Sequence, residues 1–338
     1  MAIRKEEVKA CYLCGNVGSN LYGDLTDRLF GAPGRWGFLQ CEFCGLVWLS
    51  PRPVPADVSR VYETYFTHPN GNASRGATFR EKMKRGLYST VPGNRAVCKS
   101  WVWNQAGNLL ALVPSMRERA CLGVMHLDGG VKGKLLDVGC GNGEFLTIMR
   151  DAGWNVSGVE PDPAAAKIAR NMHGILVTTG NLGDAKLPAN SFDAITLSHV
   201  IEHVYDPVGL LRECRRVLTE NGKLVVATPN VAGQGHQIFQ KSWVALDPPR
   251  HLFLFSPSTL QTCCDKAGLT VRSVHSSSRV ASWTWAASKT IARKGTFVRK
   301  SDLTLGLRLQ GLAFQMRQDK SRRLHRDVGE ELVIICSR

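Results

Sequence analysis

The chain has 338 residues, of which 43% are hydrophobic, so it is long enough to bury a large core and to carry smaller appended regions. It contains 43 Lys and Arg against 28 Asp and Glu, and the formal net charge of +15 favours anionic partners such as phosphorylated molecules, nucleic acid or an anionic membrane surface. Because the sequence has no run of about 18 apolar residues and no apolar stretch near its start, we expect a cytoplasmic protein without a membrane-spanning helix or a signal peptide.

The cysteines near the N-terminus are paired, whereas the others are scattered. Eleven cysteines, an odd number, argue against a disulfide framework and for reduced thiols. Two CxxCG knuckles begin at Cys11 and Cys41, and each presents two sulfurs from one tight turn. Four thiolates suit tetrahedral zinc better than a redox pair or ordinary buried cysteines. We therefore predict a closed structural zinc site in a ribbon over residues 1–55, with the ligands Cys11, Cys14, Cys41 and Cys44.

Residues 56–130 are predicted to form a helical region that links the ribbon to the rest of the chain. It follows a strand within residues 46–55 that ends in prolines. The aromatic segment 61–68 is either a packed helix or a set of phenols and an imidazole at a substrate entrance. Residues 70–85 are loop-like and then basic and helical, and residues 95–127 read as two helices broken near Pro114.

From Lys134 onward, short apolar strands alternate with helical stretches. This alternation predicts an α/β domain over residues 131–275, with a parallel sheet and helices on both of its faces. Ligands of such sheets bind at the carboxyl ends of the strands. The expected strands are 134–140, 154–160, 175–178, 192–198, 223–228 and 269–274, and the last strand lies within 329–338.

The first of these strands runs into a glycine-rich turn, DVGCGNG, in which Gly139, Gly141 and Gly143 leave the backbone open to a ligand. The dinucleotide fingerprint GxGxxG fails, because Glu144 occupies the place of its third glycine. A P-loop is excluded, because the turn contains no Lys followed by Ser or Thr. What remains is a glycine turn with an acidic residue, Glu160, at the end of the next strand.

With these motifs the sequence resembles the class I S-adenosylmethionine (SAM)-dependent methyltransferases. DVGCGNG, GVEPDP, NSFDAITLSHVIEHVYDP and LVVATPN occur in the order of that family's motifs, and PPRHLFLFSPSTLQ resembles its ubiquinone-methyltransferase-like branch. The resemblance covers about residues 134–275 and the final strand. It implies a Rossmann-like class I methyltransferase fold and SAM as the cofactor, but it does not specify a substrate.

Chemistry and resemblance together give an expected cofactor site. The glycines admit the amino-acid tail and the ribose, Glu160 can accept hydrogen bonds from both ribose hydroxyls, and Asp137 anchors the turn or meets the amino group through water. By resemblance, Asn181 and Leu182 flank the adenine, with Asn181 or Asp184 in the place of the family's Asp. Cys140 is expected to be there for its size. The predicted cofactor-binding residues are Asp137, Gly139, Cys140, Gly141, Gly143, Glu160, Pro161, Asn181, Leu182, Ser198 and His199.

Methyl transfer needs an in-line approach and, for an alcohol or an acidic carbon, a nearby base. The predicted catalytic residues are His199, His203 and His251. His199 is expected to face the cofactor. For His203 a structural role and a catalytic role are equal alternatives. Arg250 could pair with a phosphate of the substrate. On its own the HxxEH spacing is that of an inverted zinc-peptidase motif, but its place after the fourth strand argues against this interpretation.

Residues 276–328 form a strongly basic insert before the last strand, and we expect it to be helical. Leu305, Leu309, Leu312 and Met316 follow helical spacing and make one apolar stripe among arginines. The helices either pack on the domain with a solvated basic face, or dock a phosphate-bearing substrate, or lie on an anionic membrane at the inner face. Nucleic acid is a less favoured partner, because the insert lacks a series of stacking aromatics.

The sequence therefore predicts a SAM-dependent methyltransferase with a structural zinc ion. A zinc ribbon ahead of this domain resembles enzymes of sugar, polysaccharide or secondary-metabolite biosynthesis. By that analogy the substrate is a small phosphorylated, nucleotide-linked or lipid-linked sugar or a related metabolite, methylated on oxygen or carbon with a His base. The alternatives are an RNA methyltransferase, which would use the ribbon and the basic insert to bind nucleic acid, and a non-catalytic SAM-binding scaffold.

Overall fold

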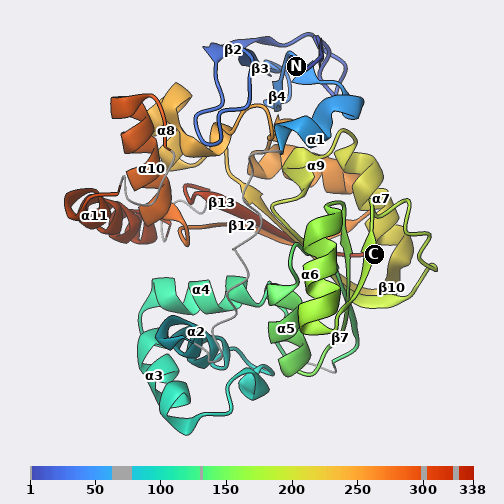
Figure 1. The fold of residues 1–338 in the computed structure, drawn as a ribbon, viewed down its shortest axis with the longest axis vertical. Coiled ribbons are helices and arrows are strands. Elements are labelled where there is room, and N and C mark those ends of the chain that lie inside the picture. The colour runs from blue at the N-terminus through green and yellow to red at the C-terminus, as the bar shows by residue number, and fades with distance from the viewer. Residues whose placement is uncertain (1, 63–77, 130–131, 298–302, 323–326) are drawn as a thin grey trace.

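The computed structural model describes residues 2–62, 78–129, 132–297, 303–322 and 327–338 (Figure 1). Most of the aromatic segment predicted at 61–68 lies outside these residues. Within them, seven strands form the main sheet, in the order β12-β13-β10-β9-β6-β7-β8. Their bounds are β6 Lys134–Val138, β7 Asn155–Glu160, β8 Leu176–Thr179, β9 Phe192–Ser198, β10 Leu218–Pro229, β12 Thr270–Ser277 and β13 Glu331–Ser337.

The main sheet is parallel except for one strand. The parallel pairs run from β10 through β9, β6 and β7 to β8, and β13 lies antiparallel between β10 and β12. Alternate side chains of β6 point to opposite faces, so Leu135 and Leu136 belong to two separate apolar clusters. The predicted Rossmann-like α/β sheet, covered on both faces, is confirmed.

The helices of this domain begin and end at local signals in the sequence. α6 (Pro163–His173) starts at Asp162, whose side chain accepts a hydrogen bond from the N–H of Ala164, and ends at the left-handed Gly174. α7 (Pro207–Val217) starts in the same way at Asp206. One face of the sheet is covered by α5 (Glu144–Asp151), α6 and α4 (Pro114–Gly123), and the other by α7 and α9 (Pro257–Lys266).

A strand from the main domain completes the sheet of the N-terminal ribbon. Among the described residues this sheet has the order β11-β4-β3-β2, in which β11 (Phe253–Leu254) pairs with β4. The strand expected within 46–55 is divided into two. The ribbon elements are β1 Lys5–Glu6, β2 Ser19–Leu25, β3 Trp36–Gln40, β4 Val47–Leu49, β5 Arg52–Pro53 and the short helix α1 Val58–Val61.

Two helical groups flank the main sheet (Figure 1). The first contains α2 (Phe79–Tyr88), α3 (Trp101–Ala111) and α4, and α4 begins at Pro114 as predicted. The second contains α8 (Gln234–Phe239) and the insert helices α10 (Ala281–Lys294) and α11 (Leu305–Ser321). No helix in the described part of the chain is long and apolar enough to cross a membrane.

The helix α11 packs on α10 through a face that the sequence pattern did not indicate. Leu307, Gly311 and Phe314 are buried, and a Cβ atom on Gly311 would lie 2.3 Å from the carbonyl oxygen of Ser282. The predicted stripe is instead exposed. We call this exposed stripe, which consists of Leu305, Leu309, Leu312 and Met316, the α11 apolar face.

Candidate cofactor and catalytic site

The glycine turn between β6 and α5 lies at the point where the connections of the sheet change direction. Gly139, Gly141 and Gly143 have φ angles of +73°, +54° and +82°, which side-chain-bearing residues rarely adopt. A Cβ atom on Gly139 would lie 2.5 Å from Cγ2 of Val200, whereas one on Gly141 would meet nothing within 4 Å. The backbone at Gly141 therefore borders open space at the carboxyl end of the sheet, where a ligand can approach.

Glu160, the last residue of β7, joins this turn to the next strand. Its Oε2 accepts a hydrogen bond from the N–H of Gly141 at 2.7 Å, and its Oε1 accepts one from the N–H of Asp162 at 2.9 Å. Burial raises the pKa of the carboxyl group, and the two N–H groups oppose that shift. Each oxygen keeps acceptor capacity beyond its one N–H bond, so the carboxylate suits the predicted role toward two ribose hydroxyls.

Asp137 and Cys140 face the protein interior. Oδ1 of Asp137 accepts a hydrogen bond from Thr196 of β9 at 2.6 Å, and burial raises the pKa of Asp137 to about 7. This bond favours the anchoring role over contact with the amino group. The sulfur of Cys140 fills the space beside Gly158, where a Cβ atom would lie only 2.4 Å from it, as expected for a residue chosen for its size.

The other predicted cofactor residues lie at the same edge of the sheet. Pro161 and Ser198 are exposed at the ends of β7 and β9. After β8, Nδ2 of Asn181 donates to Oδ2 of Asp184 at 3.2 Å, so the two candidates for the adenine-side position contact each other. Leu182 is buried in the core. The structure thus brings these positions to one edge, and their contacts with a cofactor stay predictions.

His199 follows β9 with a φ angle of +56° and lies between two carboxylates. Its Nδ1 is 3.2 Å from Oε1 of Glu202, and its Nε2 is 2.8 Å from Oε1 of Glu331. Burial lowers the pKa of His199, but the two carboxylates outweigh this effect and raise it to about 10. The ring is therefore a charged imidazolium at neutral pH, with both N–H groups donating to carboxylates, which disfavours it as a base.

The carboxylates of Glu202 and Glu331 connect His199 to further polar side chains on either side. Glu202 accepts a hydrogen bond from Thr228 at 2.9 Å, and Glu331 accepts two from Arg279, at 2.6 and 3.0 Å. Sequence reasoning did not single out Glu331, Arg279 or Thr228 as site residues. No local motif marks them, because Glu331 opens the last strand and Arg279 precedes α10, both far from His199 in the chain.

His203 and His251 lie together beside Glu202, with ring centroids 4.7 Å apart. Nδ1 of His203 is 3.0 Å from the carbonyl oxygen of Arg250, and Nδ1 of His251 is 2.8 Å from that of Ala245. Since a carbonyl oxygen only accepts, Nδ1 carries the hydrogen in each ring. Burial and the neighbouring His251 lower the pKa of His203 to about 4. His203 is therefore neutral, and its Nε2 can accept a proton.

Arg250 cannot take the predicted role of a phosphate ligand. Its side chain is 0% exposed and donates to Asp27 of the ribbon at 2.7 and 2.8 Å, as well as to Asp247. The guanidinium also lies over the ring of Phe30, at 4.5 Å from its centroid. Two carboxylates already compensate this buried cation. Arg250 instead ties the ribbon to the loop that carries His251.

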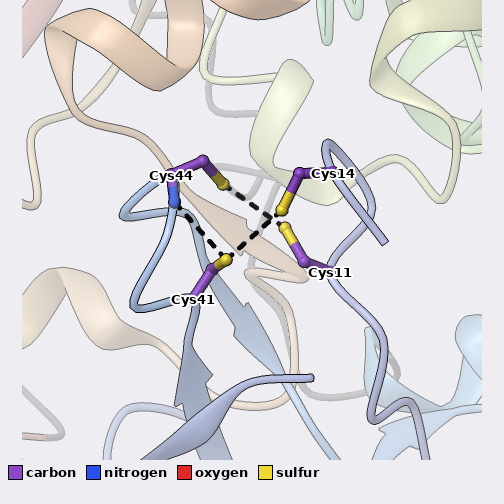
Figure 2. Close-up of side chains that lie close together, drawn as sticks. All are labelled: Cys11, Cys14, Cys41 and Cys44. Carbon is purple, nitrogen blue, oxygen red and sulfur yellow. Dashed lines mark hydrogen bonds between the residues drawn. The ribbon is translucent and has the colours of Figure 1, made fainter. Parts of the chain in front are cut away.

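The four predicted zinc ligands meet at one point of the ribbon (Figure 2). The sulfurs of Cys11 and Cys44 are 3.5 Å apart, and those of Cys14 and Cys41 are 3.4 Å apart. Tetrahedral zinc with bonds of about 2.3 Å would separate its sulfur ligands by roughly 3.8 Å, close to these distances. The donor set and its geometry therefore fit a zinc ion.

The first knuckle also contacts the main domain. The hydroxyl group of Tyr12 accepts a hydrogen bond from the N–H of Val208 at 3.1 Å and donates one to Asp206. Its ring packs on Phe253 of β11, with centroids 5.3 Å apart. The cysteine cluster is thus coupled to the start of α7, a few residues after His203.

Comparisons with known proteins show similarity to methyltransferases. The family of methyltransferase domains matches residues 115–274. A ubiquinone biosynthesis O-methyltransferase of Idiomarina loihiensis is 30% identical over 162 residues, which are 43% of this chain and 64% of that protein. A probable S-adenosylmethionine-dependent methyltransferase of Mycolicibacterium smegmatis is 34% identical over 97 residues, 28% of this chain and 38% of that protein. The chain thus covers less than two thirds of either relative.

Among solved structures, a SAM-dependent methyltransferase from Archaeoglobus fulgidus aligns with 71% of this chain and 100% of its own, with a TM-score of 0.42 and 17% identity. The family match spans β6, the glycine turn, Glu160 and the strands up to β12, and the sequence relatives carry the same assignment. Residues 115–274 of this chain are thus similar to the family of methyltransferase domains, and the names of the relatives support a SAM-dependent methyltransferase.

Proposed function

We propose that this protein transfers a methyl group from SAM to a small acceptor molecule. The observation that carries this proposal is the Glu160 carboxylate, which is held against the Gly141 backbone at the mouth of an open glycine turn. SAM, when bound, supplies the methyl group on a sulfonium. In the proposed complex the turn holds the amino-acid tail and Glu160 accepts hydrogen bonds from the ribose hydroxyls.

For the removal of a proton from the acceptor, the geometry favours His203. Its ring is neutral, and its Nδ1–H is fixed by the carbonyl oxygen of Arg250 at 3.0 Å, which leaves Nε2 as the acceptor atom. The carboxylates of Glu202 and Asp247 favour the positive charge that protonation would create. His251, at 4.7 Å between ring centroids, is the second candidate. The name of the Idiomarina relative, an O-methyltransferase, favours oxygen over carbon as the methylated atom.

His199 has a different role in this proposal. Its two N–H groups hold the carboxylates of Glu202 and Glu331, so it positions these groups as a fixed cation. Its side chain is still 38% exposed, which leaves part of the ring at the edge where the cofactor is expected.

We also propose that Cys11, Cys14, Cys41 and Cys44 bind a structural zinc ion. Four thiolates leave no coordination site for a substrate, so the metal would fix the two knuckles and take no part in methyl transfer. Through Tyr12 the zinc site would support the start of α7.

The proposed partner surface is the α11 apolar face, which would contact an anionic membrane from one side without crossing it. Four large apolar side chains, each at least half exposed, follow one line on this helix. The exposed cations Arg308, Arg317 and Lys320 lie beside it. Apolar residues flanked by cations are the composition of helices that lie in the interface of an anionic membrane.

Calorimetry with SAM and with its demethylated product tests the methyltransferase proposal. We expect one binding site per chain for each ligand. No binding of either ligand would remove the enzyme function and the SAM-binding scaffold together. Binding of RNA that falls steeply with salt would instead favour an RNA methyltransferase.

A further inference from the structure

A large cavity lies between the two helical groups of the molecule. Its volume is about 980 Å³, and its lining comes from α2, α3, α4, α10 and α11. This volume is at the upper end of the range for small-molecule sites, about 300–1,000 Å³. The sequence does not predict this site, because its walls come from distant parts of the chain, from Phe79 to Arg308, about 230 residues apart.

One part of the wall is apolar. It includes Phe79 and Met83 of α2, Met116 of α4 and Trp283 of α10. Phe79 is 69% exposed and Trp283 is 45% exposed, although both are large apolar side chains. Aromatic and thioether side chains that face an open cavity suit an apolar ligand.

The other part of the wall is cationic. Of the described residues that line the cavity, five are basic and one, Glu81, is acidic. Glu81 already pairs with Arg85 at 3.4 Å. In the described ranges no carboxylate lies within 4.0 Å of Arg80, Arg119 or Arg308. Arg119 donates one hydrogen bond, to the carbonyl oxygen of Arg279 at 3.2 Å, and its guanidinium has further N–H groups that can bind a phosphate or carboxylate.

The cavity is linked to His199 through Arg279. This residue lines the cavity, and its guanidinium donates to Glu331, which in turn accepts a hydrogen bond from His199. His199 follows the carboxyl end of β9, next to the glycine turn. A molecule in the cavity would therefore lie beside the edge of the sheet at which the cofactor is expected.

We infer that this cavity binds the methyl acceptor, and that the acceptor is an amphiphilic anion with an apolar body and a phosphate or carboxylate group. The apolar body packs against Phe79, Met83 and Trp283, and the anionic group pairs with Arg119 and Arg308. The assignment of this ligand as the methyl acceptor rests on the proposed methyltransferase function. The chemical class of the ligand does not depend on it.

Calorimetry with the full-length protein and three probes tests the ligand class: inorganic phosphate, octyl phosphate and octanol. We expect octyl phosphate to bind at least about tenfold more tightly than either of the others, because only it uses both walls. The double substitution Arg119→Gln and Arg308→Gln should weaken octyl phosphate about tenfold. Arg293→Gln, an exposed arginine of α10 outside the lining, is the matched control and should change nothing.

Equal affinity for octyl phosphate and octanol would show that the anionic group does not contribute to binding. Equal affinity for octyl phosphate and inorganic phosphate would show that the apolar body does not contribute. The acceptor assignment is tested by the NMR signals of the His199 ring, which should shift on addition of octyl phosphate through Arg279 and Glu331. Unchanged signals at saturation would contradict it. SAM binding is measured separately. If the protein bound octyl phosphate but not SAM, the proposed methyltransferase function would be contradicted and the proposed amphiphile site would still hold.

Discussion

At the scale of single residues, Glu160 combines two tasks, because the carboxylate that would bind the ribose also holds the Gly141 N–H. The substitution Glu160→Gln keeps the size of the side chain but removes its charge and one acceptor oxygen. Hydrogen bonds to a charged group contribute about 1.5–3 kcal/mol each, so we expect SAM affinity to fall by roughly 10- to 100-fold in calorimetry.

The control for this variant is Glu144→Gln, since Glu144 is exposed at the start of α5, beside the same turn. It should bind SAM like the unmodified protein. If Glu160→Gln and Glu144→Gln bound SAM equally well, Glu160 would not be a ribose ligand.

The positive charge of His199 leads to a second prediction about a single residue. Its pKa is raised to about 10 in the folded protein, against about 6.5 in an unfolded chain. The stabilisation from its protonated ring is therefore fully present below about pH 6.5 and is lost as the pH rises through about 10. Glu331→Gln removes one carboxylate, so the pKa of His199 should fall toward its ordinary value. An NMR titration of the ring, assigned with a His199→Gln variant, measures both values.

An ordinary titration of His199 near pH 6.5 in the unmodified protein would refute the imidazolium assignment. Glu213 pairs with Arg216 on α7 at 2.6 Å and is not one of the two carboxylates that contact His199. Glu213→Gln should therefore leave the His199 titration unchanged and serves as the control.

At the scale of elements, the second cysteine knuckle connects β3 to β4, and β4 pairs with both β3 and β11. Cys41→Ser removes one of the four proposed zinc ligands. We expect metal analysis to give well under one zinc per chain and the melting temperature to fall by at least about 5 °C. A chelator should lower the melting temperature of the unmodified protein in the same direction.

Cys98→Ser provides the matched control for the zinc site, because Cys98 is a buried cysteine outside the cluster. It should keep its zinc. An unmodified protein purified with zinc available and containing far less than one equivalent would remove the structural zinc from the proposal.

The α11 apolar face carries the second prediction about an element. Leu309 and Leu312 are more than half exposed, so replacing both with Ser removes apolar contacts with a membrane without opening the core. Burial of one Leu side chain contributes about 1.5–3 kcal/mol, and we expect binding to anionic vesicles to weaken by at least about tenfold. Cosedimentation with vesicles that contain phosphatidylserine measures this binding.

Leu176→Ser is the control, because Leu176 is an even more exposed leucine on β8, at the other edge of the main sheet from β12. It should leave vesicle binding unchanged. The same binding to anionic and neutral vesicles, or no effect of the double substitution, would contradict the membrane contact.

At the scale of the whole molecule, the ion pair between Asp27 and Arg250 joins the ribbon to the loop of His251. Asp27→Asn leaves a buried guanidinium with a weaker partner, so we expect the free energy of unfolding to fall by about 3–5 kcal/mol. The double variant Asp27→Asn, Arg250→Met should recover part of this loss, because it no longer buries a cation. Urea denaturation of the single and double variants measures the effect.

A matched control comes from the exposed ion pair of Asp24 and Arg35 in the same ribbon. Asp24→Asn should change the free energy of unfolding by less than about 1 kcal/mol, because solvent screens an exposed pair. A similar small change for Asp27→Asn would show that the ribbon and the main domain are coupled by other contacts.

Much of the fold could be predicted because its signals are local. The strands of the main sheet are short apolar runs, and α6 and α7 start at an Asp followed by Pro, which sets the cap and the first turn. The membership of β11 in the ribbon sheet could not be predicted in this way. Two residues, Phe253 and Leu254, carry no signal for the strand with which they pair.

The sequence by itself determined the glycine turn, the acidic residue after the next strand and the two cysteine knuckles. In each case a few neighbouring residues set the backbone shape or the donor atoms, so the order of residues was sufficient. Only the tertiary structure placed Glu331 and Arg279 beside His199, and Asp27 beside Arg250. Buried charges need partners, and those partners come from whichever distant segment the fold brings close. The tertiary structure also turned the apolar stripe of α11 outward. Gly311 approaches Ser282 of α10 closely, so α11 packs through the opposite face.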